Sequence, residues 1–365
     1  MSNVTSPTDK MLNVALIGYG FAGKTFHAPL LSATPGLRLF VVASRDAQKV
    51  HADLPDVMVI ADPQQAIAHP EVDLVVIASP NMTHASLARY ALEKNKHVVV
   101  DKPFTLDMQE ARELIELAKL RQCQLTVFHN RRWDSDYLGV RQVIEQGHIG
   151  RVVQFESHID RFRPQVRERW REQNVPGGGV WFDIGPHLID QVLQLFGLPE
   201  SVQGNIATLR DDSKINDWAH VVLNYPTLRV VLHCSMLVAG GISRFSVHGT
   251  KGSVIKQRAD CQESQLVGGM TPGSAGWGED SDALTLYVGD ETPRQLPTPA
   301  GDQRQFYLQV RDALNGKGAN PVPPLQSLAV MAVLEAAVQA SESGQNHSLE
   351  MSETEMAALR IGRAD

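Results

Sequence analysis

The sequence predicts an α/β protein with an N-terminal Rossmann-type domain, built on a doubly wound parallel sheet, and a C-terminal α+β domain with a largely antiparallel open sheet. Three observations predict this fold class. Short apolar segments alternate with helical segments over roughly the first third of the chain, and strand-like segments then follow one another with few helices between them. A glycine-rich turn joins the first strand to the first helix. The length of 365 residues suits two domains.

Residues 11–128 are expected to form the Rossmann-type domain. Six short apolar segments are typical of buried parallel strands, at residues 14–17, 39–42, 57–60, 74–78, 97–100 and 125–128. The segments between them favour helices, at residues 22–32, 47–53, 63–68, 83–95 and 106–121. Strands joined by helical crossovers form a parallel, doubly wound sheet.

Residues 129–365 are expected to form an α+β domain for substrate binding and dimerisation. Strands are predicted at residues 152–159, 204–209, 219–224, 229–236, 244–248 and 253–257, which together favour an antiparallel sheet. One helix is predicted near residues 183–196, and the Gly-rich stretch 268–282 is predicted to be a long loop. Two last helices, near 303–314 and 325–341, are placed where they can pack back on the first domain. The open sheet face favours a homodimer.

Composition excludes several classes of protein. Hydrophobic residues make up 43% of the chain and charged residues 21%, as in ordinary globular proteins. No apolar run approaches the ~18 residues needed to cross a bilayer, and residues 1–10 are polar, as in a disordered tail. The three cysteines, Cys123, Cys234 and Cys261, lack metal-site spacing and favour a reducing compartment. The net charge of −7 disfavours nucleic-acid and membrane partners, so neither is expected. The polar N-terminus lacks the apolar core of a signal peptide, so we expect a cytoplasmic protein.

A dinucleotide fingerprint lies between the first predicted strand and the first predicted helix. It has the pattern GxGxxG and consists of Gly18, Tyr19, Gly20, Phe21, Ala22 and Gly23. Gly18 permits a tight turn, Gly20 lets the backbone approach a pyrophosphate, and Gly23 lets helix and strand pack closely. A glycine-rich turn without a ligand is the alternative, which the strand–helix alternation disfavours.

The end of the second predicted strand indicates the choice of cofactor. An NAD enzyme usually carries Asp or Glu there for the ribose 2′-hydroxyl, but this chain has Ser44 followed by Arg45. A guanidinium can pair with the 2′-phosphate of NADP. The sequence therefore favours NADP(H). In the alternative, Asp46 binds the ribose of NAD and Arg45 is a solvated surface residue.

Polar residues that can handle an alcohol follow in two places. Asp101 and Lys102 come directly after the fifth predicted strand, at the sheet edge where ligands bind, although a surface lysine at a strand exit is the alternative. Asp183 and His187 are four residues apart and share a helix face. If this helix begins near Asp183, Pro186 lies in its first turn, Asp183 can be an N-cap, and His187 can be a core histidine. A metal site at this pair is ranked below base chemistry because no third ligand is evident, so no metal is predicted.

These residue types suit oxidation of a secondary alcohol. A histidine with a near-neutral pKa can take the hydroxyl proton. A carboxylate beside the ring, here Asp183, is expected to orient it and favour its cationic form. The Lys102 ammonium can stabilise the developing alkoxide, while nicotinamide takes the hydride.

Four motifs together resemble the glucose–fructose oxidoreductase, inositol dehydrogenase and rhizopine-catabolism (Gfo/Idh/MocA) family over nearly the whole chain. They are the fingerprint and the segments 79–84 (SPNMTH), 97–103 (HVVVDKP) and 177–187 (GGGVWFDIGPH). The family pattern at the lysine is Glu-Lys-Pro, and Asp101 here keeps the carboxylate. The resemblance implies that Lys102, Asp183 and His187 are catalytic. It implies cofactor contacts by Ser79, Asn81, His84, Asp101, Lys102, Asn130 and Trp170.

Within the family, the segments 128–134, 160–164 and 169–171 are most similar to NADP-dependent scyllo-inositol dehydrogenases. His158 and Arg163 are expected to touch substrate, with a salt network on the sheet surface as the alternative. The leading prediction is an NADP-dependent dehydrogenase of a cyclic polyol or sugar, with Asp183 and His187 also touching the substrate. The alternatives are an NAD-dependent glycosidase of the same family and a non-enzymatic NADP(H)-sensing regulator.

Overall fold

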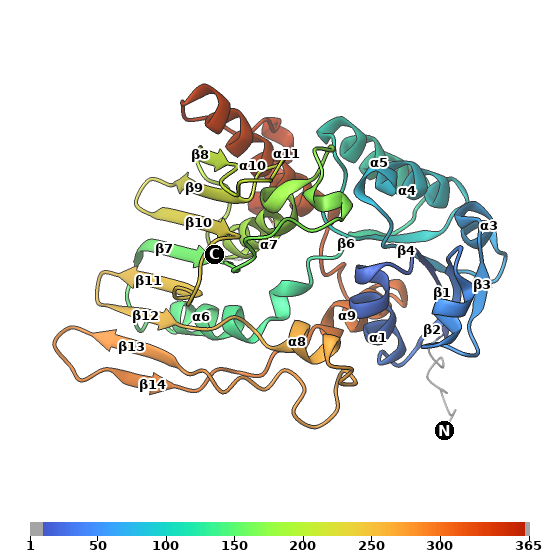
Figure 1. The fold of residues 1–365 in the computed structure, drawn as a ribbon, viewed down its shortest axis with the longest axis horizontal. Helices are drawn as coiled ribbons and strands as arrows, with labels where there is room; N and C mark the ends of the chain where they lie inside the picture. Colours follow the sequence, from blue (N-terminus) through green and yellow to red (C-terminus); the bar gives the residue numbers. More distant parts are fainter. Residues whose placement is uncertain (1–9, 362–365) are drawn as a thin grey trace, which may run out of the picture.

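The computed structural model describes residues 10–361 (Figure 1). The predicted tail lies outside the described residues, apart from Lys10, whose ammonium pairs with Asp73 at 2.6 Å. Within the described part of the chain, no helix combines the length and apolar character that crossing a membrane requires.

The first sheet is parallel and has the strand order β3-β2-β1-β4-β5-β6. Its strands are β1 (Leu12–Ile17), β2 (Leu37–Ala43), β3 (Met58–Ile60), β4 (Leu74–Ile77), β5 (His97–Val100) and β6 (Leu125–Val127). The crossover helices are α1 (Ala28–Ser32), α2 (Ala47–His51), α3 (Pro63–Ala68), α4 (His84–Glu93) and α5 (Met108–Leu120). The strand order reverses between β1 and β4, and such a reversal opens a crevice at the carboxyl ends of these strands. The doubly wound sheet is confirmed.

The second sheet has eight strands in the order β14-β13-β12-β11-β7-β10-β9-β8. They are β7 (Val152–His158), β8 (Ser201–Ala207), β9 (Trp218–Asn224), β10 (Arg229–Ser235), β11 (Phe245–Gly249), β12 (Gly252–Lys256), β13 (Leu284–Val288) and β14 (Arg294–Leu296). Neighbouring strands are antiparallel except for the parallel pair of β7 and β10. The largely antiparallel sheet is therefore confirmed.

Helices cover one face of the second sheet and leave the other open (Figure 1). The covering helices are α7 (Gly179–Phe196) and α10 (Pro324–Ser343). Phe155 of β7 packs edge-on against Phe196 of α7, so alternate residues of β7 point to the open face. Dimerisation through that face stays a prediction.

Helices near the end of the chain return to the first domain. Tyr307 of α9 (Arg304–Leu314) bonds to His27, and Met331 of α10 accepts a hydrogen bond from Thr105. Sequence reasoning missed three helices and the last two strands: α6 (Ser135–Glu145), α8 (Gln262–Val267), α11 (Glu353–Ile361), β13 and β14. The stretch 268–282 carries no helix or strand, as predicted.

Helix α7 corrects one prediction. It begins at Gly179, four residues before Asp183, so Asp183 is not its N-cap and Pro186 lies inside the helix. The first-turn amides of Val180 and Trp181 donate to Asn216, which lies far along the chain. A cap from such a distant residue leaves no local signal, and the predicted start was therefore too late.

Candidate active site

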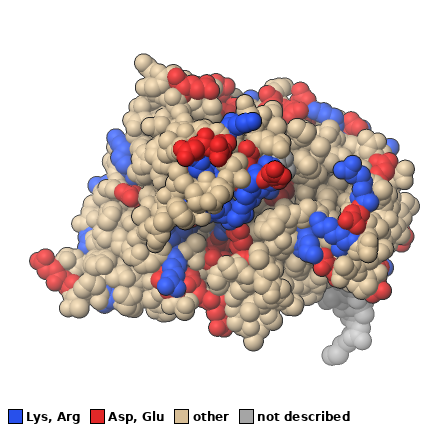
Figure 2. Space-filling model, in the orientation of Figure 1, with Lys and Arg blue, Asp and Glu red and all other residues tan. Residues whose placement is uncertain are grey.

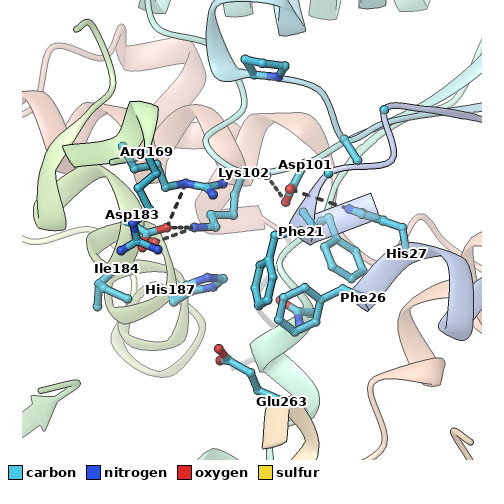
Figure 3. Close-up of a pocket in the computed structure, with 18 of the residues that line it drawn as sticks. Phe21, Phe26, His27, Asp101, Lys102, Arg169, Asp183, Ile184, His187 and Glu263 are labelled. Carbon is cyan, nitrogen blue, oxygen red and sulfur yellow. Dashed lines mark hydrogen bonds and ion pairs between the residues drawn. The ribbon is translucent and has the colours of Figure 1, made fainter. Parts of the chain in front are cut away.

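A cavity of about 820 Å³ lies where the two domains meet (Figure 3). Its first-domain wall comes from the turns that follow β1, β4 and β5, represented by Gly18, Ser79 and Asp101. Its second-domain wall comes from α7 and from the irregular segment before it. Figure 2 shows Lys and Arg side chains gathered around the hollow in the middle of this face.

The glycine turn has the geometry of a dinucleotide cradle. Gly18 has φ +101°, and a Cβ there would lie 2.8 Å from the Ala78 carbonyl oxygen. A Cβ at Gly23 would lie 2.1 Å from the Gly18 carbonyl oxygen, so turn and helix approach as closely as the motif requires. Gly20 lines the cavity and has nothing within 4 Å of its Cβ position, which leaves the backbone accessible to a phosphate. Phe21 and Ala22 also line the cavity.

Ser44 and Arg45 lie just beyond β2 and outside the cavity lining. Asp46 caps α2, because its Oδ1 accepts a hydrogen bond from the Lys49 amide at 2.9 Å. Arg45 is exposed and makes no hydrogen bond or ion pair with any residue that the structure describes. The guanidinium is therefore available to an external anion, whereas Asp46 already serves the helix.

Asp101 belongs to a buried chain of contacts that sequence reasoning missed. The fully buried His27 lies 2.6 Å from the Tyr307 hydroxyl through Nδ1, and its Nε2 lies 3.8 Å from an Asp101 oxygen. Asp101 also accepts a hydrogen bond from the Lys102 amide. Burial raises the pKa of Asp101, but His27 and Lys102 outweigh it and hold the pKa at about 2. The carboxylate therefore stays charged and fixes the backbone beside Lys102.

Lys102 reaches across the cavity to α7 (Figure 3). Its Nζ donates to the Asp183 carbonyl oxygen at 2.5 Å and to the carboxylate Oδ1 at 3.1 Å. Arg171 and Arg161 approach the same carboxylate at 3.5 and 3.9 Å. Burial alone would raise the pKa of Asp183, but the three cations outweigh burial and hold the pKa below its ordinary value. Asp183 is therefore a carboxylate surrounded by positive charge.

His187 lines the cavity, but Asp183 does not support it as predicted. The described residues show no hydrogen bond between the two, and the buried Nδ1 of His187 has no partner among them. Burial lowers the pKa of His187 well below its ordinary value, and the nearby positive charges of Lys102 and Arg131 lower it further. The prediction that Asp183 favours a cationic His187 ring is therefore wrong, because Asp183 forms ion pairs with Lys102 and the arginines instead.

The other predicted cofactor neighbours occupy different places. Ser79 and Asn130 line the cavity, and Asn130 donates to Gln303 at 2.9 Å. Asn81 and His84 do not line it. Asn81 donates to the Gly177 carbonyl oxygen, so it links the two domains.

His84 is almost fully buried between two backbone carbonyls. Its Nδ1 lies 2.8 Å from the oxygen of Pro103, and its Nε2 lies 3.0 Å from that of Ser79. Burial lowers the pKa of His84, so the ring is neutral and donates to one carbonyl at a time. His84 thus supports the turns after β4 and β5 from behind. Trp170 begins a short 3₁₀ turn (Trp170–Glu172), and its side chain lies outside the described residues.

Of the four predicted substrate contacts, Arg163, Asp183 and His187 line the cavity and His158 does not. His158 ends β7, and the chain stays extended through residue 163, paired with the strand that continues from β10. Side chains alternate along such a strand, so His158 and Arg163, five residues apart, point to opposite faces. Sequence reasoning did not name several other lining residues, among them Phe26, Arg131, Arg161, Arg167, Arg169 and Glu263. The alternation of Arg161 with Arg163 was a signal that could have found Arg161.

A Rossmann sheet, a glycine cradle at its switch point and a cavity holding an imidazole beside an ammonium define an oxidoreductase that binds a nicotinamide dinucleotide. Residues 12–129 match the oxidoreductase family domain with an NAD-binding Rossmann fold, and residues 141–350 match that family's C-terminal alpha/beta domain. The chain therefore belongs to the Gfo/Idh/MocA oxidoreductase family.

Sequence and structural relatives extend this likeness. The chain is 48% identical to the uncharacterized oxidoreductase YdgJ of Escherichia coli, over 91% of this chain and 96% of that one. It is 30% identical to the scyllo-inositol 2-dehydrogenase (NADP(+)) IolW of Bacillus subtilis, over 93% of this chain and 96% of that one. An oxidoreductase structure from Klebsiella pneumoniae is 66% identical, with a TM-score of 0.93, and the match covers 97% of this chain and 99% of that one.

Proposed function

We propose that this protein is an NADP-dependent dehydrogenase that oxidises a secondary alcohol of a cyclic polyol or sugar. One observation carries the proposal: His187, whose pKa burial holds well below its ordinary value, lines the same cavity as Lys102 and the open backbone of Gly20. A neutral imidazole can accept a proton, and an ammonium can stabilise an oxyanion, which are the two tasks that alcohol oxidation leaves to the protein.

In the proposed mechanism, His187 takes the proton from the substrate hydroxyl. Lys102 donates to the same oxygen as negative charge develops on it. Asp183 and its carbonyl oxygen hold the Lys102 ammonium in place, so Asp183 positions the lysine rather than the histidine. Bound nicotinamide would accept the hydride from the substrate carbon. Gly18, Gly20 and Gly23 would hold its pyrophosphate.

Two observations support NADP over NAD. Arg45 is exposed and unpaired among the described residues, and Asp46 is committed to capping α2. IolW, a relative over nearly its whole length, carries NADP(+) in its name. IolW is named for a polyol, scyllo-inositol, which favours a polyol substrate here. Arg161 and Arg163 supply donors on the second-domain side of the cavity that suit the oxygens of a polyhydroxylated ring.

The test is reduction of NADP⁺ by the purified protein with scyllo-inositol, followed at the absorbance of the reduced nicotinamide, beside an NAD⁺ reaction. His187→Gln should lower kcat by ~10²–10⁴-fold, the usual contribution of a general base, and leave NADPH affinity unchanged. His248→Gln is the control, because His248 lies on β11 and bonds to Ser253 outside the cavity. If His187→Gln oxidises the same alcohol as fast as the wild type does, His187 is not the general base.

A further inference from the structure

Three histidines form a row across neighbouring strands on the open face of the second sheet. His158 of β7 is the register partner of His233 of β10, which in turn pairs with His220 of β9. The ring centroids are 5.3 Å apart for His158 and His233 and 5.6 Å apart for His233 and His220. Asp160 follows His158 by two residues and therefore points to the same face. No part of this row lines the active-site cavity.

The polar atoms of this cluster are buried without partners. The Asp160 side chain is 5% exposed, and neither of its oxygens has a partner at hydrogen-bond geometry among the described residues, although the Ser235 backbone lies close enough to lower the carboxyl pKa. The same holds for Nδ1 of His158 and Nδ1 of His233. Buried polar groups are nearly always paired in folded proteins, so four unpaired atoms in one cluster require an explanation.

Direct pairing between the side chains does not provide one. Asp160 Oδ1 lies 3.6 Å from His233 Nε2, and Oδ2 lies 3.9 Å from His158 Nδ1, which is too long for a hydrogen bond. By contrast, the buried ion pair between Arg132 and Asp190 closes to 2.6 Å. The carboxylate of Asp160 instead lies between two imidazole nitrogens without a hydrogen bond to either.

We propose that His158, Asp160 and His233 bind a divalent transition-metal ion of the zinc type. Their ligand atoms all lie within 4.8 Å of one another. Tetrahedral zinc with bonds of about 2.0–2.2 Å separates its ligands by roughly 3.4 Å, so small side-chain movements close the site around the ion. Two imidazoles and one carboxylate suit zinc, and also cobalt or iron(II), better than calcium or magnesium. A fourth position remains for water or for His220.

The surroundings of the site also suit a metal. Nε2 of His158 lies 3.4 Å from Glu156 Oε2, and a carboxylate on the second ring nitrogen is the usual support of a metal-binding histidine. An ion here would tie β7 to β10 at their parallel pair. Arg161 follows Asp160 directly and lines the cavity, so the ion would also anchor the start of the arginine-bearing segment.

Zinc binding to the whole chain tests the proposal independently of activity. The protein is stripped with a chelator and titrated with Zn²⁺ by calorimetry, and Co²⁺ is added separately to record the visible spectrum of a low-coordinate cobalt site. The wild type should bind one Zn²⁺ per chain. Asp160→Asn and His233→Asn should weaken binding by more than ~100-fold, since loss of an outer-shell partner alone costs ~10–100-fold. Glu156→Gln should fall within that smaller range.

Two matched controls locate the ion. His248→Asn changes a histidine of the same sheet outside the cluster and should bind Zn²⁺ as the wild type does. His187→Asn changes the active-site histidine and should also bind normally. Thermal unfolding of each metal-free variant checks that it folds. If His233→Asn proves unstable, Asp160→Asn, which keeps the side-chain shape, provides the test. The proposal is overturned if the wild type takes up no stoichiometric Zn²⁺, if the cluster variants bind as tightly as the wild type, or if His187→Asn abolishes binding.

Discussion

The two walls of the cavity offer a ligand different chemistry. The first-domain wall presents open backbone at Gly20 and the aromatic rings of Phe21 and Phe26, which meet edge to face at 5.8 Å. The second-domain wall presents His187, Asp183 and a set of arginines. The first wall thus suits the flat rings and phosphates of a dinucleotide, while the second suits the oxygens of a reacting alcohol.

The walls are also built differently. Most groups of the first wall, such as Gly18, Ser79 and Asp101, lie in the turns that follow buried strands, so their neighbours in space are set by the order of the strands in the sheet. The second wall depends on partners far apart in the chain, such as Asn216 at the start of α7 and Glu263, which pairs with Arg131. The first wall therefore depends mainly on short consecutive segments of the chain, whereas the second wall depends on tertiary contacts between distant segments.

Lys102 joins the two walls, and its loss should have the largest effect on the comparison. Lys102→Met removes the cation that we propose donates to the substrate oxygen, and it leaves Asp183 with Arg171 and Arg161 as partners. We expect kcat to fall by ~10²–10³-fold, the usual cost of one oxyanion donor, with little change in NADPH affinity. Steady-state kinetics and fluorescence titration of NADPH measure the two quantities. Lys119→Met, on the surface of α5, is the control, and a fall in NADPH affinity equal to that in kcat would assign Lys102 to the cofactor wall instead.

The pH dependence should report His187 on the second wall. Burial, Lys102 and Arg131 lower its pKa below 6.5, so the ring stays neutral as the pH falls through that value and gains a proton only further down. The kcat/KM for alcohol oxidation should therefore stay level down to pH 6.5, and then fall by about tenfold per pH unit below the lowered pKa. In Lys102→Met, one depressing charge is gone, and the acid limb of the residual activity should move upward. A limb centred at or above pH 6.5 in the wild type would contradict the neutral, buried base.

More of the first wall than of the second could be predicted from the sequence. The spacing of Gly18, Gly20 and Gly23 predicted a turn that the structure builds as expected, because strand, turn and helix are consecutive. His27 was missed, since its partners Tyr307 and Asp101 come from distant elements. His158 was expected to touch the substrate together with Arg163. The two residues lie on one extended segment and point to opposite faces of it, so only Arg163 lines the cavity. The role of Asp183 was misjudged because a shared helix face indicates proximity, while the stronger charges of Lys102 and two arginines decide the pairing.

Arg45, which lies just beyond β2 and outside the cavity lining, should give the smallest and most selective effect. Its guanidinium is exposed and has no partner among the described residues, so Arg45→Ala removes little from the free protein. A charge-assisted contact to a 2′-phosphate in partly solvated surroundings contributes about 1.5 kcal/mol, so NADPH affinity should fall roughly tenfold while NADH affinity stays unchanged. Arg38→Ala, on the other end of β2, should alter neither affinity. If the affinities for NADPH and NADH fall equally, Arg45 does not contact the 2′-phosphate, and other residues around the adenosine decide between NAD and NADP. If only the NADPH affinity falls, the residue at the end of β2 decides between the two cofactors.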